Sequence, residues 1–281
     1  GIASQKRPIG SFIFMGPTGV GTTELARVLA REVFGSDKAL IKIDMSEFRE
    51  RHTSSRLVGA PAGYVGYEDG GQLTDKIRRQ PYSVVLLDEI EKAHPDVFQL
   101  LLQLLEDGTL TDAKGRKVDF SNTIVILTSN LGAEAMYRES EMGFDAVSAN
   151  GKLDLMHEHE KNAAAARKAL EAMMRPELIN RFDGLITFQS LSRREISSIF
   201  EIQIDELRSR LQRKGLGIQI DSRAKKQLME QGYSPKLGVR PLRRVLQEEV
   251  EHPIAEGLIA GRFERGSIIM VTSQHGKLQV Q

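Results

Sequence analysis

The sequence predicts an α/β domain built on a parallel sheet, followed by a smaller α+β domain. Short apolar segments alternate with helical patterns over residues 1–190, which is typical of a parallel sheet covered on both faces. The pattern changes after Leu191, where a long amphipathic helix follows and strands become few. We therefore expect two domains, at residues 1–190 and 191–281, with enough apolar residues for a core in each.

The first domain is expected to alternate strands with helices. The strands are Ser11–Met15, Leu40–Asp44, Ser83–Leu87, Thr123–Thr128 and Leu185–Phe188. Apolar residues at helical spacing predict helices at Glu24–Val33, Gln72–Gln80, Pro95–Glu106 and Asn162–Met174. A polar stretch at 133–161 interrupts this pattern. We expect a long excursion from the core there, because loops of this length are usually functional or mobile.

The second domain is expected to combine helices with one strand and a closing hairpin. The helices are Arg193–Lys214, Ser222–Gln231 and Arg240–Ala260, and the strand is Gly217–Asp221. Two last apolar segments, Gly266–Val271 and Lys277–Val280, are separated by Thr-Ser-Gln-His-Gly. This spacing favours a hairpin.

The composition excludes cysteine chemistry and gives no support for several kinds of partner. The net charge of +1 gives no argument for binding nucleic acid or an acidic membrane. The absence of cysteine excludes disulfides and thiolate chemistry, and it fits a reducing compartment. No apolar run approaches the ~20 residues that span a bilayer, and the N-terminus does not resemble a signal peptide. The abrupt start suggests a piece of a longer polypeptide.

The glycine-rich loop Gly16-Pro-Thr-Gly-Val-Gly-Thr-Thr23 is the first candidate for a ligand site. The phosphate-binding template G-x-x-x-x-G-K-[S/T] fits every position except Thr22, where the template has lysine. Such a loop directs backbone N–H groups and a helix dipole at a phosphate, and Thr23 can supply a hydroxyl to magnesium. Without the lysine ammonium, we expect a nucleotide site with impaired chemistry. A strand-to-helix turn that binds no ligand is the alternative.

Two carboxylates, Asp88 and Glu89, end the third expected strand, where ligands of open α/β sheets bind. We expect Asp88 to hold magnesium, directly or through water, and Glu89 to polarise the attacking water, unless they are only a solvated acidic pair. Asn130 follows the next strand and could orient that water, although an asparagine there is more often a turn residue. Arg181 and Arg240 are candidates for binding phosphate, although most arginines are exposed or ion-paired.

Six segments of the chain together resemble the second ATPase module of the Clp/Hsp100 AAA+ unfoldases. They are Gly16–Glu24, Gly63–Gly71, Leu87–Pro95, Thr128–Asn130, Arg175–Asp183 and Gly238–Leu242. The resemblance covers nearly all of the chain, and it implies an AAA+ large subdomain followed by a small C-terminal lid subdomain. It also implies ATP or ADP with Mg²⁺ as ligands, a hexameric ring, and a place in the bacterial cytosol or a derived organelle.

The resemblance assigns a role to each candidate of the nucleotide site. The Walker A residues are Gly16, Pro17, Thr18, Gly19, Val20, Gly21, Thr22, Thr23 and Glu24. Asp88 and Glu89 correspond to the Walker B pair, and Asn130 corresponds to sensor 1. Arg181 resembles the arginine finger, which acts on the ATP of the neighbouring subunit. Arg240 resembles sensor 2, which acts within its own subunit.

Two loops resemble those that contact a threaded polypeptide. Gly63-Tyr-Val-Gly-Tyr67 resembles the main pore loop, with Tyr64 and Val65 contacting the unfolded protein substrate. A tyrosine bracketed by glycines on a loop suits exposure for gripping. From the residues alone, a tyrosine packed on its own domain would be favoured. Asp107–Asp119 is polar and contains glycine, and it resembles the secondary pore loop.

The stretch at 133–161 contains a candidate partner contact. Met142, Gly143 and Phe144 are similar to the tripeptide with which some members dock on a ClpP-like peptidase. A helix stop with incidental apolar neighbours is the alternative. His157-Glu-His-Glu160 suggests a metal site, but histidines two residues apart lie on opposite faces of a helix. A solvated polar run is the simpler interpretation.

The resemblance therefore implies an ATP-driven module, most like ClpC or ClpA, that threads polypeptides toward a peptidase. The expected partners are unfolded proteins, further copies of the chain, a ClpP-like peptidase, and N-terminal modules of its own polypeptide. A ClpB-like disaggregase and a non-hydrolysing ring-assembly module are alternatives. An AAA+ protein that works on DNA is disfavoured, because no basic stripe with base-reading side chains is present. Thr22 is either natural or introduced to stop hydrolysis. We favour the second, since a naturally retired site should lose more than one catalytic group.

Overall fold

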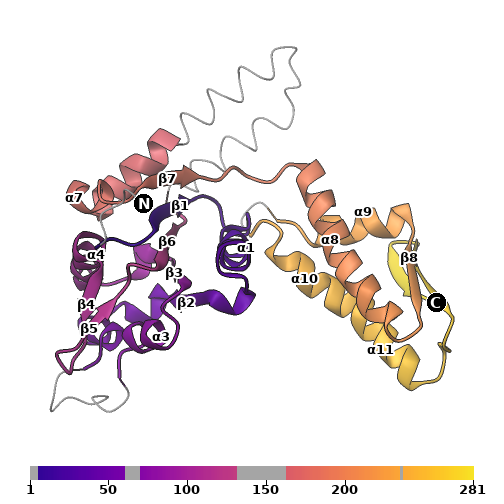
Figure 1. Cartoon of the computed structure of the whole chain (residues 1–281). Coiled ribbons are helices and arrows are strands. Elements are labelled where there is room, and N and C mark those ends of the chain that lie inside the picture. Colours follow the sequence, from indigo (N-terminus) through magenta and orange to yellow (C-terminus); the bar gives the residue numbers. More distant parts are fainter. Residues whose placement is uncertain (1–5, 61–69, 132–162, 235–236) are drawn as a thin grey trace. The chain divides into compact units, whose positions relative to one another are not determined.

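The computed structural model describes residues 6–60, 70–131, 163–234 and 237–281. The chain forms two compact units (Figure 1), one made of residues 1–16 and 21–189 and the other of residues 17–20 and 190–281. Within the described ranges, no helix combines the length and the apolar composition needed to cross a membrane.

The first unit is built on a five-stranded sheet in the order β2-β3-β6-β1-β7. The strands are β1 (Gly10–Met15), β2 (Leu40–Asp44), β3 (Ser83–Asp88), β6 (Thr123–Ser129) and β7 (Gly184–Thr187). All neighbouring strands run parallel, which confirms the predicted parallel sheet. Each strand begins and ends within one residue of its expected range.

Helices cover both faces of this sheet, because successive side chains of a strand point to opposite faces. On one face, Phe14, Leu86 and Ile126 pack against Ala26 and Ala30 of α1 (Thr22–Phe34). On the other face, the strands pack against α3 (Thr74–Arg79), α4 (Asp96–Asp107), α7 (Pro176–Ile179) and the helical residues 163–173. Figure 1 shows α1 and α4 on opposite sides of the sheet.

Several short elements of this unit were not expected from the sequence. They are α2 (Arg51–Ser54) and the 3₁₀ turns Asp37–Ala39, Met45–Phe48, Ser55–Leu57 and Ile90–Lys92. One helical turn has too few residues to give a periodic pattern. The stretch Asp107–Asp119, expected as a loop, contains the antiparallel hairpin of β4 (Thr109–Thr111) and β5 (Lys117–Asp119). Its three-residue strands bury only Leu110 and Val118, so polar residues dominate the sequence.

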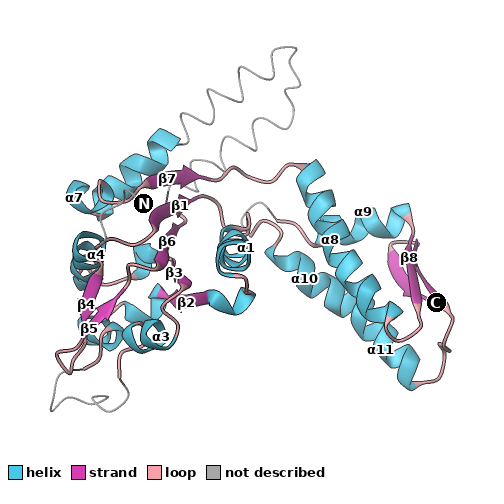
Figure 2. Cartoon of the chain, viewed as in Figure 1, coloured by secondary structure: helices cyan, strands magenta, loops and turns pink. Residues whose placement is uncertain are grey.

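The second unit has a separate core and its own three-stranded sheet (Figure 2). Its helices are α8 (Arg193–Gln212), α9 (Ser222–Gln231), α10 (Arg240–Leu246) and α11 (His252–Ile259), and its strands are β8 (Gly217–Ile220), β9 (Ile268–Gln274) and β10 (Lys277–Val280). Strands β9 and β10 pair antiparallel, which confirms the predicted hairpin. Strand β8 joins them by pairing parallel with β9.

The single helix predicted for 240–260 is divided by a π-helical stretch, Gln247–Glu251, between α10 and α11. Pro253 follows this stretch, at the start of α11. Proline has no backbone N–H, so the carbonyl of Glu249 cannot receive its normal helical hydrogen bond. A locally widened turn is one way in which a helix accommodates such a loss.

Candidate nucleotide site

The glycine-rich loop joins β1 to α1, as predicted, and two of its glycines have backbone angles that other residues rarely adopt. Gly19 has φ 78° and Gly21 has φ 101°, both in the left-handed region. Helix α1 begins directly afterwards at Thr22. Its N-cap residue is Gly21, which has no side chain to accept hydrogen bonds from the first N–H groups of the helix. The first N–H groups of a helix need acceptors, and an anion is a suitable one.

The two acids after β3 are held together by a neighbouring hydroxyl. Asp88 is two residues after Leu86, so it lies on the sheet face that α1 covers. Thr128 of β6 lies on the same face, two residues after Ile126. Its Oγ1 donates to Oδ1 of Asp88 over 2.5 Å and accepts from the backbone N–H of Glu89 over 3.1 Å. One hydroxyl therefore fixes both the carboxylate and the turn that follows it.

Glu89 has an uncommon backbone conformation for a residue with a long side chain. Its φ is 57° and its ψ is 53°, in the left-handed region. Such residues cost roughly 1–3 kcal/mol and concentrate at functional sites. The chain turns away from the strand here, and the Glu89 side chain remains partly exposed, with Lys92 Nζ 3.9 Å from Oε2. This geometry favours a chemical role for Glu89 over a merely solvated acid.

Lys42 is a site residue that the sequence analysis missed. It lies on β2, on the same face as Leu40, and its Nζ is 2.6 Å from Oδ2 of Asp88. Both oxygens of Asp88 therefore have a partner, one a hydroxyl and the other an ammonium group. In the sequence, Lys42 is an exposed position of an amphipathic strand, and only the pairing of β2 with β3 brings it to the acid.

Beyond β6, the chain reaches Asn130, which is partly buried as the strand ends. Close to it is Glu91, in the 3₁₀ turn after Glu89. Burial raises the pKa of the Glu91 carboxyl, and the charge of Glu89 raises it further. Glu91 was not a predicted site residue, because its position in the sequence suggests only another surface acid.

The two candidate arginines lie in different units. Arg181 follows α7, and its guanidinium forms an ion pair of 2.5 Å with Glu106 of α4 while remaining about half exposed. Arg7 donates a hydrogen bond to the backbone carbonyl of Arg181. Arg240 belongs to the second unit, where it is the first residue of α10. The roles of both residues stay predictions.

The remaining predicted contacts lie outside the described residues. They are Tyr64, Val65, Met142, Gly143, Phe144 and the run His157–Glu160. In the described ranges, no group of three or more His, Cys, Asp or Glu side chains could enclose a metal ion. A magnesium ion usually keeps several waters and uses one or two carboxylates together with phosphate oxygens. Asp88, whose carboxylate is largely buried at the end of β3, is of the type that such a site uses, and the role of Thr23 stays a prediction.

Comparisons with known proteins agree with this geometry. Residues 7–185 match the family model of an AAA domain (Cdc48 subfamily), and residues 191–271 match the C-terminal, D2-small domain of ClpB protein. The chain is 50% identical over 281 residues to the negative regulator of genetic competence ClpC/MecB of Bacillus subtilis, covering 100% of this chain and 34% of that protein. It is 49% identical over 271 residues to the ATP-dependent Clp protease ATP-binding subunit ClpC of Staphylococcus aureus, covering 96% of this chain and 32% of that protein.

A solved structure, the S. cerevisiae Hsp104-ADP complex, is similar with a TM-score of 0.84 and 35% sequence identity. The similarity covers 100% of this chain and 46% of that one. The chain thus spans about a third of the length of the curated relatives it matches.

Proposed function

Because the chain belongs to the Clp/Hsp100 family of AAA+ ATPases, as a second ATPase module similar to ClpC, we propose that it threads polypeptides through a hexameric ring toward a ClpP-like peptidase. The observation that carries the proposal is the pair Asp88 and Glu89, fixed by the Thr128 hydroxyl at the edge where ligands of such sheets bind. Substrates, ring and peptidase belong to the proposal, as do N-terminal modules of the same polypeptide.

Each residue of the nucleotide site has a proposed task. Bound ATP and Mg²⁺ supply the phosphoryl group and the charge that polarises it. The loop from Gly16 to Thr22 binds the phosphates through its backbone N–H groups. Thr23 and Asp88 hold Mg²⁺, Glu89 polarises the attacking water, and Asn130 orients it.

We propose that Arg181 acts on the nucleotide of a neighbouring subunit. Its guanidinium is about half exposed, and its partner Glu106 holds it in place while no neighbour is bound. Arg240 is assigned to the nucleotide of its own subunit. An arginine fork suits the oxygens of a terminal phosphate, which supports both assignments.

Thr22 is expected to impair hydrolysis in this form of the module. It is the first residue of α1, where a threonine offers no charge to the outer phosphates. Losing one such electrostatic contact typically costs a factor of about 10²–10³ in rate. We favour a substitution that stopped hydrolysis in an otherwise complete site, because Asp88, Glu89 and Asn130 are all present.

The test is to restore lysine and measure ATP hydrolysis by the assembled protein. We expect Thr22→Lys to raise turnover by about 10²–10³, and Glu89→Gln added to it to remove the gain while nucleotide binding persists. A protein that forms nucleotide-dependent rings but shows no turnover after Thr22→Lys would instead be a ring-assembly module.

A disaggregase module is the second candidate function. It is favoured by the match of residues 191–271 to the D2-small domain of ClpB. Degradation of an unfolded protein by an added ClpP-like peptidase distinguishes the two functions, since a disaggregase refolds polypeptides without feeding a peptidase.

A further inference from the structure

Glu91 has a buried carboxyl group that no step of the proposed function uses. It lies in the 3₁₀ turn Ile90–Lys92, directly after the acid pair. Both of its carboxyl oxygens are shielded from water, and among the described residues neither has a hydrogen-bond partner. Buried polar groups are nearly always hydrogen-bonded, so an exception in a native fold calls for an explanation.

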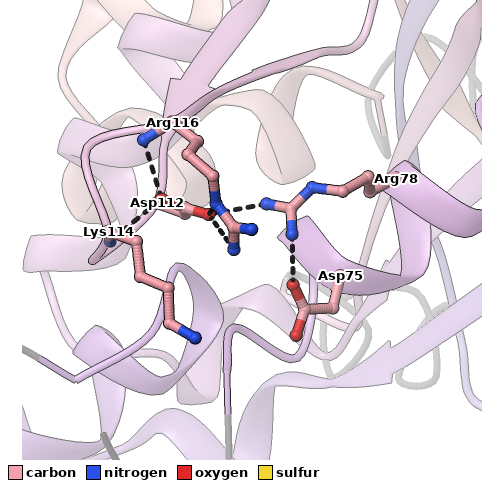
Figure 3. Close-up of polar contacts among 5 residues, drawn as sticks. All are labelled: Asp75, Arg78, Asp112, Lys114 and Arg116. Carbon is pink, nitrogen blue, oxygen red and sulfur yellow. Dashed lines mark hydrogen bonds and ion pairs between the residues drawn. The ribbon is translucent and has the colours of Figure 1, made fainter. Parts of the chain in front are cut away.

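A second buried acid of the same unit, Asp112, shows the usual arrangement. It lies in the turn of the β4–β5 hairpin, and its side chain is only 4% exposed. Oδ1 accepts the backbone N–H groups of Lys114 and Arg116 over 2.9 and 2.8 Å. Oδ2 accepts Nε of Arg116 over 2.8 Å and a guanidinium N–H of Arg78 over 2.6 Å (Figure 3). Asp112 is thus fully partnered, whereas the oxygens of Glu91 accept nothing from the described part of the chain.

Three hydrogen-bond donors lie near the Glu91 carboxyl without bonding to it. They are the Ser129 hydroxyl, the backbone N–H of Asn130 and the N–H of Glu91 itself. Burial raises the pKa of this carboxyl, the three donors lower it, and the charge of Glu89 raises it further. The donors are therefore close, yet none is aligned well enough to form a hydrogen bond.

Two of these donors belong to the end of β6, which also contacts other parts of the site. Thr128, one residue earlier, holds the acid pair through its hydroxyl. The carbonyl of Ser129 accepts the N–H of Gly16, the first residue of the glycine-rich loop, over 3.2 Å. A carboxylate that draws this segment toward itself therefore changes the position of Asn130 relative to Glu89.

The turn that contains Glu91 has two features that oppose folding. One is the left-handed backbone of Glu89, and the other is the unpartnered carboxyl of Glu91. Costs of this kind persist at sites where function requires them. A residue that served only the fold would be expected to have partners, as Asp112 does.

We propose that Glu91 is a positioning residue for Asn130. When nucleotide fills the site, its carboxylate accepts the Ser129 hydroxyl and the backbone N–H of Asn130, and it thereby sets the Asn130 amide beside Glu89. The proposal rests on the proposed function, in which Asn130 orients the water that Glu89 polarises. The two new hydrogen bonds offset part of the cost of the buried charge, which links a filled site to a fixed Asn130.

The test compares three variants of the assembled Thr22→Lys protein. Glu91→Met offers no strong acceptor, Glu91→Gln keeps one carbonyl oxygen, and the control Glu171→Met removes an exposed ion pair with Arg167. Turnover of ATP, its KM, the binding of labelled ADP and unfolding by urea are measured for each. We expect Glu91→Met to lower kcat by about 10- to 100-fold with KM and ADP binding unchanged, because Asn130 is misplaced only in the reacting complex. Glu91→Gln should recover part of the loss.

Unfolding by urea separates positioning from a role in the fold. We expect Glu91→Met to resist urea at least as well as Glu171→Met does, because the change removes a buried charge that has no partner. A loss of turnover without a loss of stability is the result that supports the inference.

Two results would overturn the inference and leave the proposed function intact. One is a kcat of Glu91→Met equal to that of Glu171→Met. The other is a Glu91→Met protein that unfolds at lower urea concentration and loses ADP binding together with turnover, since Glu91 would then support the fold alone. If the Thr22→Lys parent binds ADP but hydrolyses no ATP, the proposed function and this inference fail together.

Discussion

Asp88 and Asp112 are both largely buried carboxylates beside basic side chains in the first unit, yet their surroundings differ. An ionised carboxylate can accept about four hydrogen bonds. Asp112 receives donors from two backbone N–H groups and two arginines, so its oxygens are fully used. Among the described residues, Asp88 receives only the Thr128 hydroxyl and the Lys42 ammonium. Asp88 retains oxygen lone pairs for a ligand, whereas Asp112 can only support structure.

Neutralising Asp88 tests whether its remaining oxygen lone pairs serve a ligand. In the assembled Thr22→Lys protein, we expect Asp88→Asn to lower ATP turnover by about 10²–10³, because magnesium would lose the charged ligand proposed for it. Unfolding by urea should change little, since an amide can keep the Thr128 contact. Turnover equal to that of Thr22→Lys alone would contradict the assignment of Asp88.

The matching change at Asp112 should affect stability and leave the chemistry intact. We expect Asp112→Asn to lower the free energy of unfolding by about 2 kcal/mol at pH 7, because charge-assisted hydrogen bonds are weakened in a buried turn. The lowered pKa of Asp112, about 2, means that the carboxylate stabilises the fold above its unfolded pKa near 3.8. This contribution is lost as the pH falls from about 4 to 2.

Urea unfolding of the parent and of Asp112→Asn at pH 7, 4, 3 and 2 measures this loss. The difference in unfolding free energy between the two proteins should shrink as the pH falls through this window. A difference that stays constant from pH 7 to pH 2 would show that the charge of Asp112 does not stabilise the fold.

The smallest expected effect concerns Lys42, whose ammonium occupies an oxygen of Asp88 that magnesium would approach. We expect Lys42→Met to reduce the Mg²⁺ concentration needed for half-maximal binding of labelled ADP by about threefold, since the lysine is partly exposed and its ion pair is weak. Lys226→Met, which removes an exposed lysine paired with Glu230, is the control. A higher Mg²⁺ requirement in Lys42→Met would mean that Lys42 assists the metal.

The parts of the fold that the sequence analysis predicted well are those with strong local patterns. Strand β3 contains a continuous apolar run, and the acid pair directly follows it, so position alone marked Asp88 and Glu89. The loop was recognisable because its glycines stand at fixed spacing, which the left-handed angles of Gly19 and Gly21 explain. These features depend only on residues that are adjacent in the sequence, so the sequence alone is enough to predict them.

The features that were missed depend on contacts between distant residues. Lys42 reaches Asp88 only through the register of β2 and β3, and Arg78 reaches Asp112 across 34 residues. Thr128 entered the sequence analysis only as the first residue of the segment Thr128–Asn130. Its two hydrogen bonds join it to Asp88 and Glu89, at the end of a neighbouring strand. No local pattern distinguishes such residues from ordinary polar positions on a strand or helix.

The widened turn at Gln247–Glu251 has a consequence for how the second unit keeps its shape. The core residues Leu242, Leu246, Val250 and Ile254 recur at intervals of four. In a regular α-helix, that interval rotates each successive side chain by about 40°, so the row would spiral off the core. A turn with more residues reduces the rotation. The apolar ridge can thereby run straight along the core. A repeat of four residues is therefore the sequence pattern that accompanies a helix with a widened turn.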